Sequence, residues 1–320
     1  MFELSTDVAN LKELREGDFS AYDALYLGDF SCPDYPNNFS SHPELLEAGL
    51  DLVKARGQKA YLRLYAVPGN SDLGWVEDLV DAALELPFDA FEVHNLGLLR
   101  MLREKGCRLP IHLGVFGNLY THETAKVLKE YGVTRVYPNP ELSLDEVRYI
   151  ADNADVEVLV PVHGKIPLVI SETCFILEHS EQGEEDGAQS GNGCGDGTCS
   201  YQCTQEHWLK RGRSDGSRAD WSLKDTGRMT LSGKDLCMLE HAATLAGMGL
   251  KHFYVHNKGE AGGYAAQVGG IYRDALVRAF AGKDAEDPAP LLATLTGLAR
   301  EGLCNGYYFE GAGQRYFGRV

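Results

Sequence analysis

Short apolar runs alternate with amphipathic helical patterns along most of this 320-residue chain. One helical segment separates each apolar run from the next. The amphipathic segment that starts at Ser143 has Glu146 three residues later, and these two residues form the sequence pattern of a capping box. The predicted strands are 24–27, 59–67, 90–94, 111–116, 134–137, 156–162 and 251–256. The predicted helices are 44–56, 75–86, 96–105, 121–131, 143–153, 232–246, 265–280 and 291–302. This order predicts parallel strands joined by right-handed helical crossovers.

So many consecutive strand–helix units favour an α/β fold of the (β/α) TIM-like barrel type, complete or incomplete, over an open doubly wound sheet. No Gly-x-Gly-x-x-Gly follows the first predicted strand, which weakens a nucleotide-binding fold further. We expect a barrel domain over 1–282, with a cysteine-bearing insertion at about 174–230. Residues 283–320 are expected to form a linker and a C-terminal extension packed on the barrel.

Charge and cysteine content exclude several classes of protein. The formal net charge of −17 argues against a large basic face for nucleic acid. The first residues lack a basic flank and an apolar run, so we expect no signal peptide, and no stretch approaches the roughly 20 apolar residues that span a bilayer. The chain is therefore expected to be cytoplasmic. In that compartment its eight cysteines are expected to be thiols or metal ligands.

Four cysteines are the strongest candidates for a metal centre. Cys199 and Cys203 form a close pair, Cys174 lies upstream of them, and Cys32 directly follows the first predicted strand. Thiolates are soft ligands, and four of them suit an iron–sulfur cluster or a structural zinc ion. Two alternatives stay open for single positions. Cys237 is the leading substitute for Cys32, and Cys194 is a spare ligand.

Polar residues follow the predicted strands with some regularity. In a (β/α) barrel the reactive groups lie on the loops after the strands, at one face. The candidates at these positions are His94, Asn118, Glu141, His163 and His256. His163 and Glu141 are the candidate catalytic residues, although Glu141 also lies where a helix cap would be. His94, Asn118 and His256 are candidate substrate-binding residues.

Arg63 is the remaining candidate for substrate binding. It lies inside the second predicted strand, and a buried cation needs a partner. The side chain is therefore either paired structurally or aimed at an anionic ligand, such as a carboxylate.

Several stretches of this sequence resemble the collagenase-like U32 peptidase superfamily, and together they cover about residues 20 to 310. The core elements are PELSL at 140–144, VEV at 156–158, HG at 163–164 and LSGKDLC at 231–237. Four further elements resemble the UbiV branch of that superfamily: YLGDFSC at 26–32, IPLVISETCF at 166–175, CSYQC at 199–203 and CNGY at 304–307.

The resemblance implies a barrel-like fold and a 4Fe-4S cluster held by Cys32, Cys174, Cys199 and Cys203. It implies a role in oxygen-independent hydroxylation during ubiquinone biosynthesis, together with a UbiU-like homologous subunit and with prephenate as the source of the hydroxyl group. Other branches hydroxylate RNA bases or are described as peptidases. The family's acidic–glycine–arginine stretch after the final strand is replaced here by His256-Asn257-Lys258-Gly259, which puts the substrate in doubt.

The competing functions are a U32-type peptidase, an RNA-base hydroxylase and a non-catalytic iron–sulfur partner subunit. No Ser-His-Asp order or His-Glu-x-x-His motif is present, and four thiolates leave zinc no open position for hydrolysis. The negative charge disfavours RNA as a substrate. The first expectation is therefore a cluster-bearing hydroxylase subunit.

Overall fold

Eight parallel strands close into a barrel in the computed structural model, which describes residues 1–181, 199, 201–211, 221–258, 260, 262–283 and 287–319. Hydrogen bonds join the strands in the order β1 to β7, and β11 pairs with both β7 and β1, which closes the ring. The barrel strands are β1 Glu3–Val8, β2 Ala24–Leu27, β3 Lys59–Arg63, β4 Ala90–Val93, β5 Ile111–Leu113, β6 Val133–Val136, β7 Glu157–Ile170 and β11 His252–Val255. The predicted TIM-like barrel is confirmed, and of the two forms expected it is the complete one.

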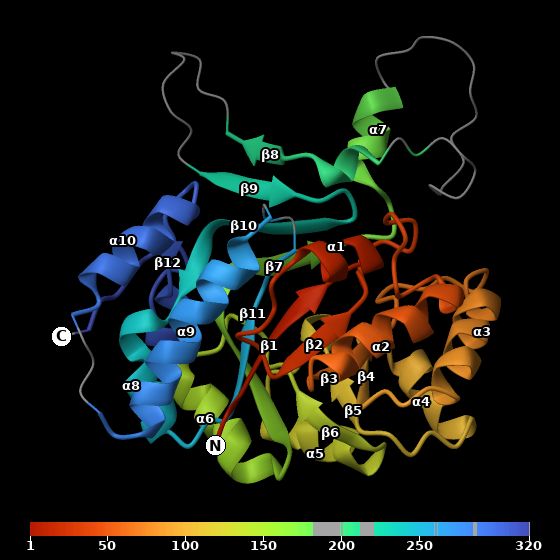
Figure 1. Ribbon diagram of the computed structural model, residues 1–320, viewed down its shortest axis with the longest axis horizontal. Coiled ribbons are helices and arrows are strands. Elements are labelled where there is room, and N and C mark those ends of the chain that lie inside the picture. The colour runs from red at the N-terminus through yellow and green to blue at the C-terminus, as the bar shows by residue number, and fades with distance from the viewer. Residues whose placement is uncertain are drawn as a thin grey trace.

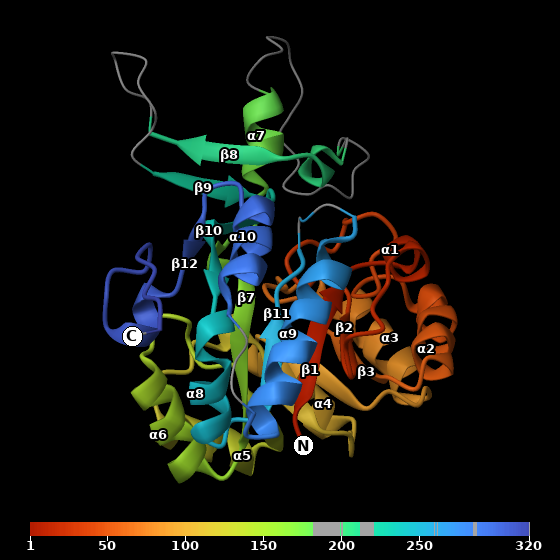
Figure 2. The same cartoon turned by 60° about the vertical axis from the view of Figure 1, so that its left-hand side comes forward.

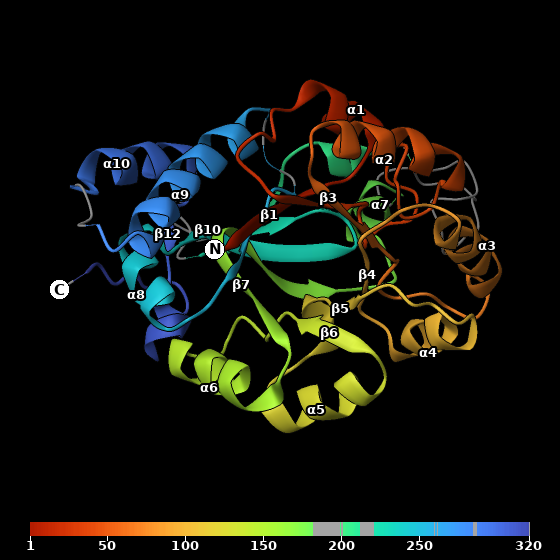
Figure 3. The ribbon, with the colours of Figure 1, turned by 60° about the horizontal axis from the view of Figure 1, so that its bottom comes forward.

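Helices cover the outside of the ring (Figure 3). Their apolar faces pack on the outward residues of the strands, and most predicted helices agree with the observed ones within a few residues. Ser143 and Glu146 form the predicted capping box at the start of α6. The covering helices are α1 Leu11–Glu16, α2 Leu46–Ala55, α3 Leu73–Leu84, α4 Leu96–Glu104, α5 His122–Glu130, α6 Leu144–Ala154, α8 Ala242–Gly247 and α9 Tyr264–Phe280, with short 3-10 turns at Pro43–Leu45, Val115–Gly117 and Leu239–His241.

The inside of the barrel holds charged and polar groups among apolar and aromatic side chains. At the end of the barrel where the strands begin, Arg135 Nη1 lies 2.6 Å from Glu3 Oε1, and Tyr61 donates a hydrogen bond of 3.0 Å to the same carboxylate. His112 Nδ1 lies 3.1 Å from the Tyr26 hydroxyl. A buried charge is tolerated only when it is paired and hydrogen-bonded. This layer therefore closes the lower end of the barrel with ion pairs as well as apolar packing.

Strand β7 runs past the barrel and carries the insertion (Figure 1). Its second half pairs with antiparallel β10, in a register that sets Cys237 opposite His163 and Met229 opposite Ile170. Two further antiparallel strands extend this ribbon, and it stands above the mouth of the barrel. The inserted elements are α7 Phe175–Glu181, the 3-10 turn Gln202–Thr204, β8 His207–Lys210, β9 Ser222–Asp225 and β10 Met229–Cys237.

Three sequence predictions need correction. The first strand of the barrel is β1, which the sequence analysis missed. The sixth predicted strand does not end at 162, because β7 continues to Ile170. The helix predicted over 232–246 does not begin at 232, because residues 232–237 belong to β10, and only the 3-10 turn Leu239–His241 and α8 are helical there.

The physical reason for the last correction lies between β7 and β10. Lys165 and Asp235 form a buried ion pair across the two strands, and Ser232 Oγ accepts a hydrogen bond of 2.8 Å from Ile166 N. Ser232 and Asp235, three residues apart, looked like a helix start. Their side chains bond instead to the neighbouring strand.

The C-terminal residues pack beside the ribbon (Figure 2). They form α10 Ala289–Leu298, β12 Leu303–Cys304, which pairs with β10, and the 3-10 turn Gly306–Phe309. Tyr308 donates a hydrogen bond of 2.9 Å to Pro161 O of β7, and Asn305 Nδ2 donates to Cys237 O and Phe317 O. Within the described ranges, no helix is long and apolar enough to cross a membrane.

Candidate metal centre and barrel mouth

The four cysteines predicted as ligands converge above the mouth of the barrel. A Cβ atom built on Gly227 would lie 2.9 Å from Cys174 Sγ and 3.5 Å from Cys203 Cβ. Burial and the nearby thiols of Cys32 and Cys199 together raise the pKa of Cys203 to about 12. Segments far apart in the sequence therefore bring the four cysteines near one another, and within the described residues no three of them form a ligand set already arranged around a metal ion.

The loop after β2 is built to present Cys32. Asn38 Nδ2 donates hydrogen bonds of 2.9 Å to both Asp29 O and Cys32 O. Asn38 Oδ1 accepts from Asp29 N at 2.7 Å and from Ser40 N at 3.0 Å. One buried amide side chain thus uses its donor and acceptor groups to hold the loop that carries this thiol.

The two alternative ligands are Cys237, which the structure describes, and Cys194, which lies outside the described residues. Cys237 is fully buried on β10, where the Tyr272 hydroxyl lies 3.6 Å from its sulfur. It pairs with His163, seven residues before the end of β7, so at ~3.3 Å per residue it lies roughly 23 Å along the strand from the end that leads to Cys174. The structure therefore does not bring Cys237 to the other three thiols.

Arg63 is held by protein groups at the upper end of the barrel. Its Nε lies 2.8 Å from Glu92 Oε1, as an ion pair that is not aligned as a hydrogen bond. Its Nη2 donates to the Tyr254 hydroxyl at 2.8 Å, and that hydroxyl donates to Asp7 Oδ1 at 2.6 Å. The guanidinium also lies 5.0 Å from the centre of the Phe30 ring. Of the two interpretations of Arg63, structural pairing is the arrangement observed.

His94 is neutral and oriented at the same level. Phe116 N donates to His94 Nδ1 at 3.3 Å, so the ring proton is on Nε2, which lies 3.2 Å from Glu92 Oε1. Burial lowers the pKa of His94, and the ring of Phe30 stacks on it at 4.2 Å. The substrate-binding role of His94 stays a prediction.

His256 differs from its neighbours because both of its ring nitrogens are buried without a hydrogen-bond partner. Burial, with the positive charges of Arg63 and Lys258, lowers its pKa to about 4 against the opposing influence of Asp7. An unsatisfied buried polar group costs on the order of 1–3 kcal/mol. A neutral imidazole with one donor and one acceptor to offer is therefore available where the barrel opens toward the cysteines.

The other predicted site residues lie apart from this group. Asn118 and Glu141 are exposed on the rim, and Tyr120 donates to Glu141 Oε2 at 3.3 Å. His163 is buried on the outward side of β7, where Nδ1 lies 3.3 Å from the Tyr272 hydroxyl of α9. The catalytic roles predicted for Glu141 and His163 are not tested by these positions, but neither residue faces His256 across the barrel mouth.

Sequence reasoning missed Asp7, Glu92 and Tyr254. Asp7 lies near the end of β1, the strand that was overlooked, and Glu92 and Tyr254 lie inside strands whose alternation points them into the barrel. Charged residues at alternate positions of short strands are the sequence feature that could have indicated polar groups inside the barrel.

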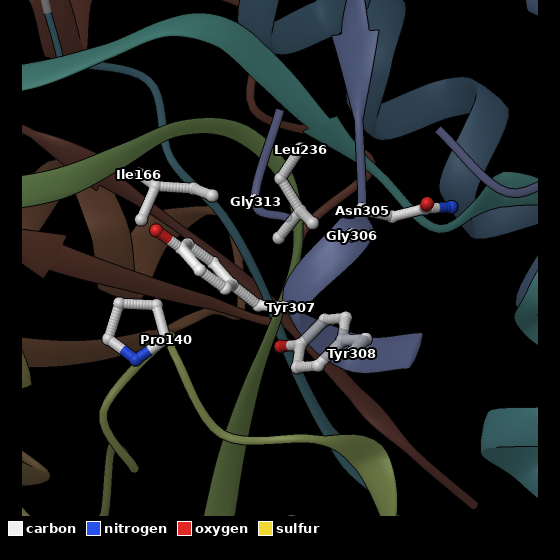
Figure 4. Close-up of a pocket in the computed structure, with 8 residues that line it drawn as sticks. All are labelled: Pro140, Ile166, Leu236, Asn305, Gly306, Tyr307, Tyr308 and Gly313. Carbon is white, nitrogen blue, oxygen red and sulfur yellow. The ribbon is translucent and has the colours of Figure 1, made fainter. Parts of the chain in front are cut away.

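Two hollows lie away from this site. Figure 4 shows a small one between β7, β10 and the C-terminal turn, with mostly apolar and aromatic lining: Pro140, Ile166, Leu236, Asn305, Gly306, Tyr307, Tyr308 and Gly313. A wider, open groove lies at the lower end of the barrel, near Phe2, Lys59 and Arg273. Neither contains a predicted site residue.

Comparisons with known proteins agree with the sequence motifs. The model of peptidase family U32 matches residues 10–317. The tRNA hydroxylation protein P of Escherichia coli strain K12 is 27% identical over 350 aligned positions, which cover 95% of this chain and 74% of that protein. The uncharacterized protease MJ0090 of Methanocaldococcus jannaschii is 28% identical, over 86% of this chain and 65% of its own length. The solved structure of the U32 peptidase Mk0906 aligns with 52% of this chain and 70% of its own, with a TM-score of 0.42 and 16% identity.

Proposed function

We propose that this chain, which belongs to peptidase family U32, is an iron–sulfur protein that takes part in oxygen-independent hydroxylation. The observation that carries the proposal is the convergence of Cys32, Cys174, Cys199 and Cys203. Four thiols without a nitrogen or oxygen ligand among them match the donor set of a 4Fe-4S cluster. The same set gives little support to a zinc peptidase, because four thiolates leave the metal no open position.

The geometry around the thiols also fits a cluster. Gly227 has φ +90°, and a Cβ there would come within 2.9 Å of Cys174 Sγ. The lack of a side chain at Gly227 therefore leaves room beside Cys174 that any other residue would fill. When bound, such a cluster supplies one-electron transfer. The chain would hold it with Cys32 from the β2 loop and the other three cysteines from the insertion.

The barrel mouth supports a site for a small polar substrate. His256 offers one donor and one acceptor, and His94 keeps its proton on Nε2. Arg63 already contacts Glu92 through Nε and Tyr254 through Nη2, so a carboxylate, such as those of prephenate, would share the guanidinium with these protein groups. The proposal therefore gives the first substrate contacts to His256 and His94, and keeps Arg63, Asn118, Glu141 and His163 as candidates for variant tests.

Two substrate classes follow from two different observations. The UbiV-like elements favour a ubiquinone precursor, and the similarity to a protein named for tRNA hydroxylation favours a base in RNA. The net charge of −17 favours the small molecule. We therefore propose the quinone precursor first. The test is anaerobic incubation of each substrate with the chain and its partner, followed by mass spectrometry for one added oxygen atom, and hydroxylation of tRNA alone would reverse the order.

The cluster itself is tested by purification without oxygen. We expect a brown protein with about four iron and four sulfide per chain. Alanine at Cys32, Cys174, Cys199 or Cys203 should abolish the colour, whereas Cys237→Ala, which removes another buried thiol, should keep it. Stoichiometric zinc without iron would contradict the proposal, and so would a cluster that survives Cys32→Ala but not Cys237→Ala.

A homologous, UbiU-like subunit is proposed as the partner. The support is the UbiV resemblance. Co-expression should yield a complex of the two chains, and hydroxylation should require both. Full activity of the isolated chain would remove the partner from the proposal.

A further inference from the structure

Lys258 occupies the space between the barrel mouth and the cysteines. It follows β11 two residues after His256, and its ammonium forms an ion pair with Asp29. It also donates a hydrogen bond of 2.9 Å to Ser31 Oγ and lies 5.3 Å from the centre of the Tyr35 ring. The side chain is only 12% exposed. Water therefore screens this charge much less than it screens a surface lysine.

The groups that hold the ammonium also hold Cys32. Asp29 Oδ1 accepts from Ser31 N at 2.8 Å and from Ser31 Oγ at 2.7 Å. Ser31 is the residue before Cys32, whose carbonyl is bonded to Asn38. Lys258 thus joins the loop after the last barrel strand to the loop that presents the first proposed ligand.

The ammonium of Lys258 lies directly beside the loop that carries Cys32. Its hydrogen bond goes to Ser31 Oγ, and Ser31 is the neighbour of Cys32 in the chain. A positive charge is therefore fixed next to the first proposed ligand by contacts that the loop itself provides.

We propose that Lys258 is a positioning residue for the metal centre, which locks the Cys32 loop to the barrel mouth and raises the reduction potential of the cluster. The inference rests on the proposed function, since it needs a cluster at the four cysteines. Reduction adds one electron, and a fixed buried cation stabilises the more negative reduced form. No residue of the chain needs to change its protonation for this effect.

The test is a redox titration of the anaerobically purified chain with dithionite, followed by EPR. In Lys258→Met, Asp29 is left without its cation, so the reduced-to-oxidised ratio at a fixed ambient potential should fall at least tenfold, which is about 59 mV for a one-electron couple. Asp29→Asn keeps an oxygen for Ser31 and removes the negative charge, so the ratio should rise. Lys258→Arg keeps the charge and should stay within about threefold of the wild type.

Lys59→Met is the matched control. It removes a lysine that is paired with Glu3 at 2.8 Å, at the opposite end of the barrel. The inference is overturned if Lys258→Met and Lys59→Met have the same potential, or if Asp29→Asn lowers it or leaves it unchanged. Should Lys258→Met bind no iron, Asp29→Asn and Lys258→Arg decide by the same criteria. A wild-type chain without any cluster would instead refute the proposed function.

Discussion

At the scale of single residues, the histidines of this protein are distinguished by burial. Burial lowers the pKa of both His163 and His256 to about 4. Both rings are therefore neutral in the folded protein at pH 7, and both stay neutral well below the ordinary histidine pKa of about 6.5. His256 lies at the barrel mouth, whereas His163 packs against Tyr264 and Tyr272 of α9. Neutral imidazoles at these places link the stability of the fold to pH.

His163→Gln tests this link away from the barrel mouth. The unfolded chain binds a proton at this histidine below about pH 6.5, but the folded chain binds it only near pH 4, so stability is lost as the pH falls between these values. The wild type should lose roughly 2 kcal/mol more than His163→Gln between pH 7 and pH 5. Urea unfolding at both pH values measures this, with His122→Gln at the surface as the control. Equal losses in all three proteins would show that His163 is not held neutral.

At the scale of elements, the turn between β9 and β10 lies directly beside Cys174 and Cys203. Gly227 N donates to Asp225 Oδ1 at 2.7 Å, and Phe175 N of α7 donates to Gly227 O at 2.9 Å. The turn is thus bonded both to its own hairpin and to the segment that follows Cys174. Its left-handed backbone and its contact with that thiol both require glycine.

Gly227→Ala should therefore lose the cluster. The added Cβ would press on Cys174 Sγ at 2.9 Å, in a backbone conformation that already costs alanine about 1 kcal/mol. Gly57→Ala is the matched control, because Gly57 has φ +72° but nothing within 4 Å of the new Cβ. Iron content should fall to near zero in Gly227→Ala and stay at the wild-type level in Gly57→Ala. Equal iron in the two variants would mean that the turn does not shape the site.

At the scale of the whole molecule, a closed barrel carries a ribbon above its mouth. The barrel has an apolar core between strands and helices, and its lower end is tied by the Arg135–Glu3 ion pair. The cysteines join two parts of the chain above the barrel strands, namely the loop at 28–41 and the insertion. Loss of a metal there should loosen these two parts and leave the barrel folded.

Removal of the metal by a chelator tests this division. Amide hydrogen exchange should accelerate by at least tenfold at 28–41 and at 201–210, while the barrel strands β3 to β6 stay protected. Mass spectrometry of peptides from holo and chelated protein measures both regions at once. Faster exchange across all strands would show that the cluster supports the entire fold, and unchanged exchange everywhere would show that it binds elsewhere.

Much of this architecture could be predicted from the sequence, because helices and strands each produce a characteristic spacing of apolar residues among neighbouring positions. The alternation predicted seven of the eight barrel strands, and the capping box at Ser143 marked the start of α6. The position of Cys32 directly after a predicted strand also agrees with its place at the barrel mouth, because strand ends share one face. Strand β1 escaped because Glu3 and Asp7 make a short run look polar, although both point into the barrel.

Tertiary structure alone decided what fills the barrel and where the ribbon begins. Arg63 meets Tyr254 across 191 positions of sequence, and Lys258 meets Asp29 across 229. Only closure of the ring brings such partners together, so no local pattern could reveal them. The same holds for 232–237, where a local pattern typical of a helix start gave way to pairing with β7. Local periodicity selects the elements, whereas long-range pairing of buried charges decides which side chains meet at the site.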